Sequence, residues 1–159
     1  MKGTDKGFTF LELMVVIAII ALLSAIAVPN MISWRNNHKF KGAYQNIRAD
    51  LRLAQGRALR ERAPVSVVFS SSQYDIFVDN GAGGGTANDY NRNGSEPLVR
   101  LRSLPAGVTV DLAATTIAGD RTQFDARGRC LATGTVVVRN FSGQPKNISI
   151  NPLGRIRLN

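Results

Sequence analysis

The sequence is poor in the residues that most catalytic and metal sites need. Its 159 residues include one cysteine, Cys130, and one histidine, His38. One cysteine cannot close an intramolecular disulfide, and the two residues together cannot supply a closed zinc site. We therefore expect a fold that stands on its hydrophobic core, with no enzymatic activity and no cofactor. Cys130 follows "RGR", so a reactive thiol beside positive charge is the alternative to a buried, inert cysteine.

Acidic residues are also scarce. The chain has 11 Asp and Glu against 20 Lys and Arg, a formal net charge of +9 and a pI near 10.6. This balance favours an anionic partner, either nucleic acid or a lipid surface, and does not choose between them.

Polar residues are almost absent from residues 8–28, where Thr9, Glu12 and Ser24 are the exceptions. At about 1.5 Å per residue this run crosses a hydrocarbon core of about 30 Å. The basic residues Lys2 and Lys6 predict a cytoplasmic N-terminus. An ordinary signal peptide is the alternative, but the apolar run continues into a helical pattern, and a membrane glutamate would be costly in a disposable segment.

The stretch "GFTFLELMVVIAIIALLSAIAVP" at residues 7–29 resembles the class III signal of type IV pilins and type II secretion pseudopilins. The resemblance implies that prepilin peptidase cuts between Gly7 and Phe8 and methylates the new N-terminus. It also implies that Glu12 pairs with the amino group of a neighbouring Phe8 and so sets filament register, and that Pro29 bends the helix. Phe10 departs from the usual leucine. The alternative for Glu12 is that it reaches the cytoplasmic headgroups.

A second helical pattern follows Pro29. Apolar residues at steps of four and three predict an amphipathic helix to about Arg62, ended by Pro64; they are Phe40, Tyr44, Ile47, Leu51, Ala54 and Ala58. The other sides are basic, with Arg35, Lys39, Lys41, Arg48, Arg52, Arg57, Arg60 and Arg62. We interpret them as a solvated face near lipid headgroups at its upstream end, with a dedicated binding surface as the alternative.

Beyond Pro64 the period changes to two, which is typical of strands. Strands are predicted at 65–70, 74–79, 97–104, 107–112, 121–126, 134–141, 146–151 and 154–159, with a Gly-rich loop at 80–96. The expected class is α+β, a long N-terminal helix packed on an antiparallel β-sandwich or open barrel. The predicted parts are a leader (1–7), a transmembrane helix half (8–28), an amphipathic helix half (29–62) and a β-rich domain (63–159).

Three short motifs in the β-rich part are similar to the GspH/FimT family of minor pilins and minor pseudopilins: "FDARGR", "TVVVRN" and "NPLGRIRL". The resemblance implies a structural subunit of a type IV pilus or type II secretion pseudopilus. Its partners would be prepilin peptidase, other pilins or pseudopilins and the inner membrane, which it would cross once with its C-terminal domain in the periplasm.

The segment "GRIR" resembles a GRxR motif of DNA-binding FimT-type minor pilins, which assigns DNA binding to Gly154, Arg155 and Arg157. The strand period places both arginines on one face, and "VRLR" does the same with Arg100 and Arg102. The alternative is a pseudopilin that contacts only other subunits and binds no DNA, with arginines that are solvated or paired with a neighbour.

One loop imitates a metal site. Asp89, Asn91 and Asn93 match the first half of a calcium loop, but Arg100 occupies the place of the closing glutamate. A polar turn is the favoured interpretation.

Overall fold

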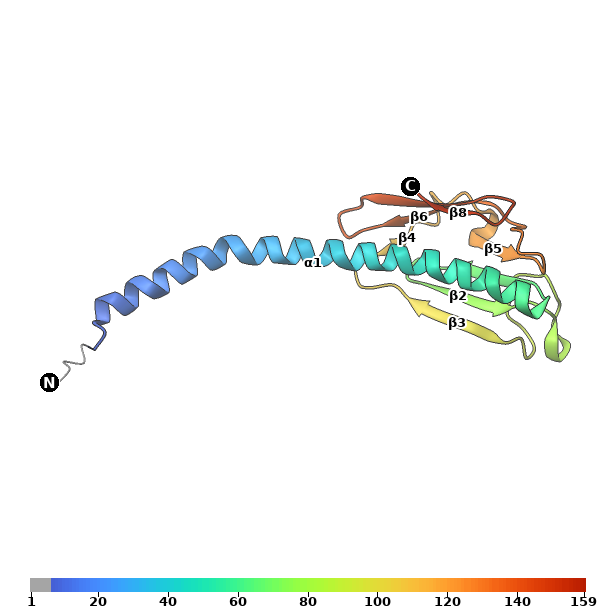
Figure 1. Cartoon of the computed structure of the whole chain (residues 1–159), viewed down its shortest axis with the longest axis horizontal. Helices are drawn as coiled ribbons and strands as arrows, with labels where there is room; N and C mark the ends of the chain where they lie inside the picture. Colours follow the sequence, from blue (N-terminus) through green and yellow to red (C-terminus); the bar gives the residue numbers. More distant parts are fainter. Residues whose placement is uncertain (1–6) are drawn as a thin grey trace. The chain divides into compact units, whose positions relative to one another are not determined.

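The computed structural model describes residues 7–159, so residues 1–6 of the predicted leader lie outside the described residues. One long helix, α1 (Phe10–Glu61), opens the chain (Figure 1). The side-chain oxygen of Thr9 accepts the backbone N–H of Glu12 at 3.2 Å and caps the first turn. The helix ends where Arg62 adopts a left-handed φ of 53°, two residues before Pro64, close to the predicted boundary.

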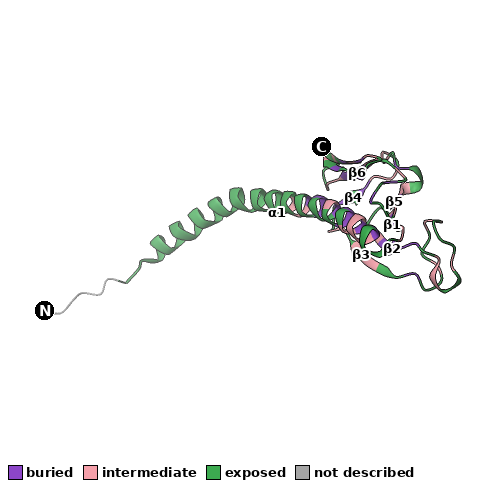
Figure 2. Cartoon of the chain, turned by 45° about the vertical axis from the view of Figure 1, so that its right-hand side comes forward, coloured by how far each residue is buried: buried purple, intermediate pink, exposed green. Residues whose placement is uncertain are grey.

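The chain divides into two compact units, residues 1–37 and 38–159. In the first unit every residue from Gly7 to Arg35 is exposed (green in Figure 2). By length and composition the helix could cross a membrane, with a mean hydropathy of 2.8 over its most apolar window, none of which is buried. Pro29 lies inside the helix, where it removes one backbone hydrogen bond.

The second unit contains the rest of α1 and two antiparallel four-stranded sheets. The first sheet has the order β3 (Leu98–Ser103), β2 (Gln73–Val78), β1 (Val65–Phe69), β5 (Arg121–Phe124). The second has the order β4 (Thr109–Val110), β6 (Gly134–Arg139), β7 (Pro145–Ile150), β8 (Ile156–Leu158). Short 3₁₀ helices lie at Ala82–Gly84 and Ala118–Asp120. The predicted α+β class is confirmed, and every predicted strand is present, although β4 is much shorter than expected.

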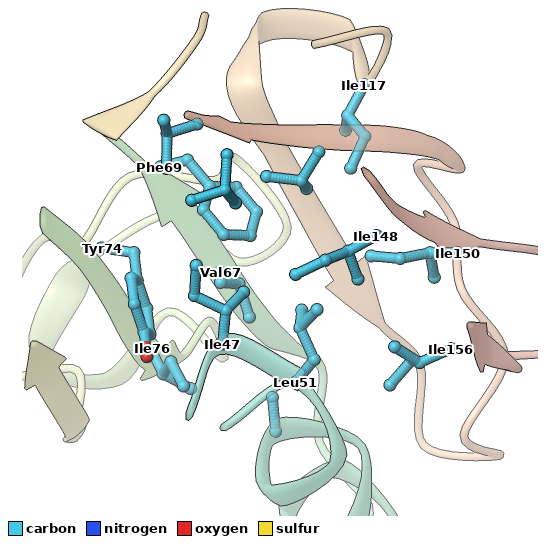
Figure 3. Close-up of a cluster of buried hydrophobic side chains, with 14 of the residues drawn as sticks. Ile47, Leu51, Val67, Phe69, Tyr74, Ile76, Ile117, Ile148, Ile150 and Ile156 are labelled. Atoms are coloured by element: carbon cyan, nitrogen blue, oxygen red, sulfur yellow. The ribbon is translucent and has the colours of Figure 1, made fainter. Parts of the chain in front are cut away.

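The core lies between α1 and the two sheets. Figure 3 shows Ile47 and Leu51 of the helix among Val67 and Ile76 of the first sheet and Ile148 of the second. All six apolar helix positions predicted from the period are buried. Burial of each large aliphatic side chain stabilises the fold by about 1.5–3 kcal/mol, so the part of the helix from residue 38 onward is an integral part of the second unit.

Candidate functional site

The predicted processing junction lies just before the helix. Phe8 is 84% exposed, and Gly7 has open space where a side chain would be. Together with Thr9 and Glu12 these residues line a shallow depression. Because Gly7 and Phe8 precede α1, their peptide bond is not held in a helix, and both residues are exposed. The Glu12 side chain lies on the exposed surface of the first turn, where a second chain can reach it.

The predicted arginines lie at the C-terminal edge strand, with Arg157 in β8 and Arg155 directly before it. Arg155 and Arg157 are exposed and Ile156 is buried, so the predicted alternation is confirmed. A tight turn precedes the strand, in which the Gly154 N–H donates to the Asn151 carbonyl at 2.9 Å. The Arg155 N–H donates to the side-chain oxygen of Asn151 at 2.8 Å. This turn fixes the position of the Arg155 backbone, from which the side chain extends.

Arg155 and Arg157 share one shallow polar depression, lined also by Ser149, Ile150, Asn151 and Asn159. The Asn159 side-chain amide donates to the Ser149 hydroxyl at 3.0 Å. Within residues 7–159 neither arginine forms a salt bridge. Two guanidinium groups without a carboxylate partner, next to amide groups, are suited to a phosphate or a carboxylate from outside the chain.

Gly154 fits tightly against the chain itself. Its φ is +73°, and an added Cβ would overlap the Gln55 side-chain amide and the Gly128 carbonyl oxygen. Those two groups are joined, because the Gln55 Nε2 donates to the Gly128 oxygen at 2.7 Å. The backbone at this glycine is therefore packed against Gln55 of α1 and the Gly128 segment, which brings the start of β8 against the helix.

Arg100 and Arg102 are arranged differently. Both reach the carboxylate of Asp50 on α1, with an Arg100 Nη1–Oδ1 distance of 2.8 Å and an Arg102 Nε–Oδ2 distance of 2.7 Å. The Tyr74 hydroxyl donates to the same carboxylate at 2.7 Å. Burial, reinforced by this hydrogen bond, raises the pKa of Tyr74 far above its ordinary value, so the hydroxyl remains a donor.

The four arginines thus do not form one site. β3 is an edge of the first sheet and β8 is an edge of the second, and Arg100 and Arg102 are already paired within the chain. Asp50, which is 3% exposed, is not among the residues predicted from the sequence. The signal was available, because Asp50 lies between Ile47 and Leu51 on the apolar side of the helix, where an unpaired carboxylate would be costly.

The loop at 80–96 contains a short 3₁₀ helix and several hydrogen-bonded turns, one of them around Asp89. The Asp89 carboxylate accepts the Asn91 N–H at 2.8 Å and the Asn93 side-chain amide at 2.7 Å. The buried Asp79 accepts N–H groups of Asn88 and Tyr90 at 2.6 and 3.0 Å. Over the described range of the chain, no three His, Cys, Asp or Glu side chains are grouped to hold a metal ion.

Cys130 is buried rather than exposed. Its sulfur lies 3.0 Å from the Thr122 hydroxyl and 3.1 Å from the Ala132 carbonyl oxygen. Burial raises the pKa of the thiol above its ordinary value, against the opposing effect of these hydrogen bonds. The thiol is therefore protonated near neutral pH, which is the inert form.

Comparison with known proteins identifies the family. Residues 3–28 match the prokaryotic N-terminal methylation motif, and residues 43–154 match the family described as type II transport protein GspH. The chain belongs to the GspH family. This family match covers most of the second unit, including α1 from Ala43 onward and the sheets up to Gly154, whereas the methylation motif covers the apolar part of the first unit.

Individual proteins are similar to this chain in part of the sequence or in fold. The type IV major pilin protein PilA of Myxococcus xanthus is 47% identical over 45 residues, 28% of this chain, and the chain spans 20% of that relative's length. The minor pilin FimU of Pseudomonas aeruginosa has a similar structure, with a TM-score of 0.58, 17% identity and coverage of 79% of this chain and 92% of FimU. The minor pseudopilin EpsH of Vibrio cholerae gives a TM-score of 0.55 at 14% identity, covering 76% and 93%. The fold of this GspH-family chain is therefore pilin-like.

Proposed function

We propose that this chain is a minor pilin or minor pseudopilin. It would be held in the inner membrane by the first half of α1, with a cytoplasmic N-terminus and a periplasmic β-rich domain, and then built into a type IV pilus or a type II secretion pseudopilus. The observation that carries the proposal is that one continuous helix joins the methylation motif to the GspH-family domain.

The assembly mechanism follows from the first turn of α1. Prepilin peptidase cuts between Gly7 and Phe8 and methylates the new amino group. An ionised carboxylate within a membrane costs a few kcal/mol, so Glu12 gains by meeting the amino group of Phe8 in a neighbouring subunit. Such a pair fixes the axial register of adjacent helices, as buried polar groups do in coiled coils.

Mass spectrometry of the protein from cells that contain the peptidase tests this mechanism. The expected mature chain begins at an N-methylated Phe8, and Gly7→Arg blocks the cut. Gly3→Arg adds the same charge to the leader away from the scissile bond and leaves processing intact. An intact Met1, or a cut after Ala27, contradicts the proposal. The mature chain loses Lys2, Lys6 and Asp5, so its formal charge falls from +9 to +8.

We further propose that the C-terminal depression binds DNA during uptake. The supporting observation is that Arg155 and Arg157 are exposed, adjacent and without a carboxylate partner in the described part of the chain. No aromatic residue lines the depression, so phosphate contacts dominate over base stacking, and binding is weak, insensitive to sequence and steeply dependent on salt. Arg100 and Arg102 contribute less, because Asp50 holds them. The competing role is contact with carboxylates of a neighbouring subunit.

A mobility-shift assay with duplex DNA and the full chain in detergent separates the two roles. We expect Arg155→Gln with Arg157→Gln to abolish the shift at low salt. In a single substitution of either arginine, one phosphate contact is lost. The slope of the logarithm of the binding constant against the logarithm of the salt concentration should then fall in magnitude by roughly 0.9. Arg92→Gln with Arg127→Gln removes the same charge from two other exposed positions and leaves the shift intact. If the Arg155 and Arg157 variant binds DNA as well as the unsubstituted chain, the DNA-binding role is wrong. Contact with other subunits would then be the remaining role.

A further inference from the structure

Trp34 is the only tryptophan of the chain, and it lies at the surface of α1 just beyond the apolar run. This residue is 62% exposed, and Met31 and Ile32 are similarly exposed. Ala27, Asn30, Met31 and Trp34 line a shallow, mostly apolar depression on this part of the helix. The next residue, Arg35, is exposed and basic. An apolar depression, an aromatic ring and a cation therefore follow one another in this part of the helix.

The axial spacing matches the dimensions of a bilayer. Trp34 is about 9 Å beyond Val28, the last residue of the apolar run, at about 1.5 Å per residue. Glu12 and Trp34 are about 33 Å apart along the helix, slightly more than the hydrocarbon thickness of about 30 Å. When Glu12 lies at one edge of the hydrocarbon, Trp34 lies among the headgroups at the opposite edge.

We propose that Trp34 and Arg35 form an interfacial anchor that binds phospholipid headgroups, with a preference for anionic lipid, and sets the depth of α1. The indole has an apolar ring for the acyl boundary and an N–H for a headgroup oxygen, which is why tryptophan concentrates at membrane interfaces. The Arg35 guanidinium adds attraction to lipid phosphate. The proposal rests on the membrane-spanning state proposed above.

The anchor has a consequence for Glu12. A helix free to slide could bring this carboxylate deeper into the hydrocarbon, where its cost rises. A helix held by Trp34 keeps Glu12 near the headgroups at the other side until a neighbouring amino group is available. Trp34 is in this sense a positioning residue for Glu12, although the two lie at opposite ends of the apolar segment.

The single tryptophan makes the depth directly measurable. The full chain is placed in phosphatidylcholine vesicles containing phosphatidylglycerol, with lipids brominated either near the glycerol or near the chain end. We expect Trp34 fluorescence to be quenched at least about twofold more by the shallow bromines, because tryptophan favours the interface. The matched control, Trp34→Phe with Ile19→Trp, moves the probe to mid-helix and is quenched more by the deep bromines.

These readings separate failure of the anchor from failure of the proposed function. If neither probe is quenched, the helix is not inserted and the membrane-spanning role fails. A different outcome is that the Ile19→Trp probe is quenched most by the deep bromines while Trp34 is unquenched or also quenched most by the deep bromines. In that case the membrane-spanning role is kept and the anchor proposal is overturned.

A second measurement tests whether the anchor sets depth. A spin label at Leu11→Cys, in a Cys130→Ala background, reports the depth of the first turn through its accessibility to a polar relaxant. We expect Trp34→Ala with Arg35→Gln to change that accessibility at least about twofold, and more so with phosphatidylglycerol present. Leu22→Ala is the control, because it removes apolar surface away from the interface. We expect it to leave the accessibility of the label unchanged. An unchanged label in the anchor variant overturns the proposal.

Discussion

Removal of the Asp50 carboxylate should destabilise the second unit strongly. Asp50 accepts hydrogen bonds from Tyr74, Arg100 and Arg102 and joins α1 to β2 and β3. A hydrogen bond to a charged group contributes about 1.5–3 kcal/mol. The two arginine side chains are 40% and 33% exposed, so solvent screens their share. Asp50→Ala also leaves the buried Tyr74 hydroxyl without its acceptor, which costs about 1–3 kcal/mol.

Together these effects predict a loss of about 3 kcal/mol of unfolding free energy for Asp50→Ala. For a domain of this size the melting temperature would fall by roughly 10 °C. Thermal unfolding of the full chain in detergent, followed by near-ultraviolet circular dichroism, measures the change. Tyr74→Phe added to Asp50→Ala should recover part of the loss, because no buried hydroxyl then lacks a partner.

Asp111 provides the matched control. Its carboxylate pairs with Arg139 at the protein surface, where ion pairs contribute little, so Asp111→Ala should lower the melting temperature far less. A loss below about 1 kcal/mol for Asp50→Ala, or an equal effect of the two substitutions, would refute the reasoning that the buried carboxylate holds the helix to β3.

Three further outcomes are expected. Glu12→Ala should insert and be cleaved normally but be depleted from sheared filaments, and normal incorporation would reject the register role. Gly154→Ala should cost about 3 kcal/mol because strain at positive φ adds to steric overlap, whereas Gly143→Ala, at a φ of +75° with open space around it, should cost about 1 kcal/mol; equal melting temperatures would contradict this. Cys130 is buried and its pKa is raised, so maleimide should label it very slowly at pH 7 and still slowly at pH 9 in the folded protein, and quickly in denaturant. Fast labelling of the folded chain would show that burial does not protect the thiol.

Secondary structure was predictable where one period dominated. The helix face from Phe40 to Ala58 repeats at three and four, and all of its predicted members are buried. The largest departure among the strands is at 107–112, where Thr109–Val110 alone forms β4. The Asp111 side chain accepts the Ala114 N–H at 3.1 Å, and its carbonyl accepts the Thr115 N–H at 2.9 Å. This local turn ends the strand that the alternation favoured.

The sequence predicted which side chains of the candidate site face outward, but not which residues they contact. Alternation correctly placed Arg155 and Arg157 outward, because it depends on neighbouring residues alone. The pairing of Arg100 and Arg102 with Asp50 depends on how a distant helix turn meets β3, and local periodicity carries no information about that meeting. Gly154 shows the same limit, since its close neighbours, Gln55 and Gly128, come from two other segments.

The order of the strands also determines when the domain can fold. β1 pairs with β2 through a short turn, but its other neighbour is β5, with Val65 opposite Phe124. That partner follows roughly sixty residues later in the chain, after β4, a strand of the other sheet, and such long-range pairing is slow to form. The sheet stays open along β1 until Phe124 is available. A chain interrupted before β5 would expose a strand edge rich in valine, an open template for aggregation.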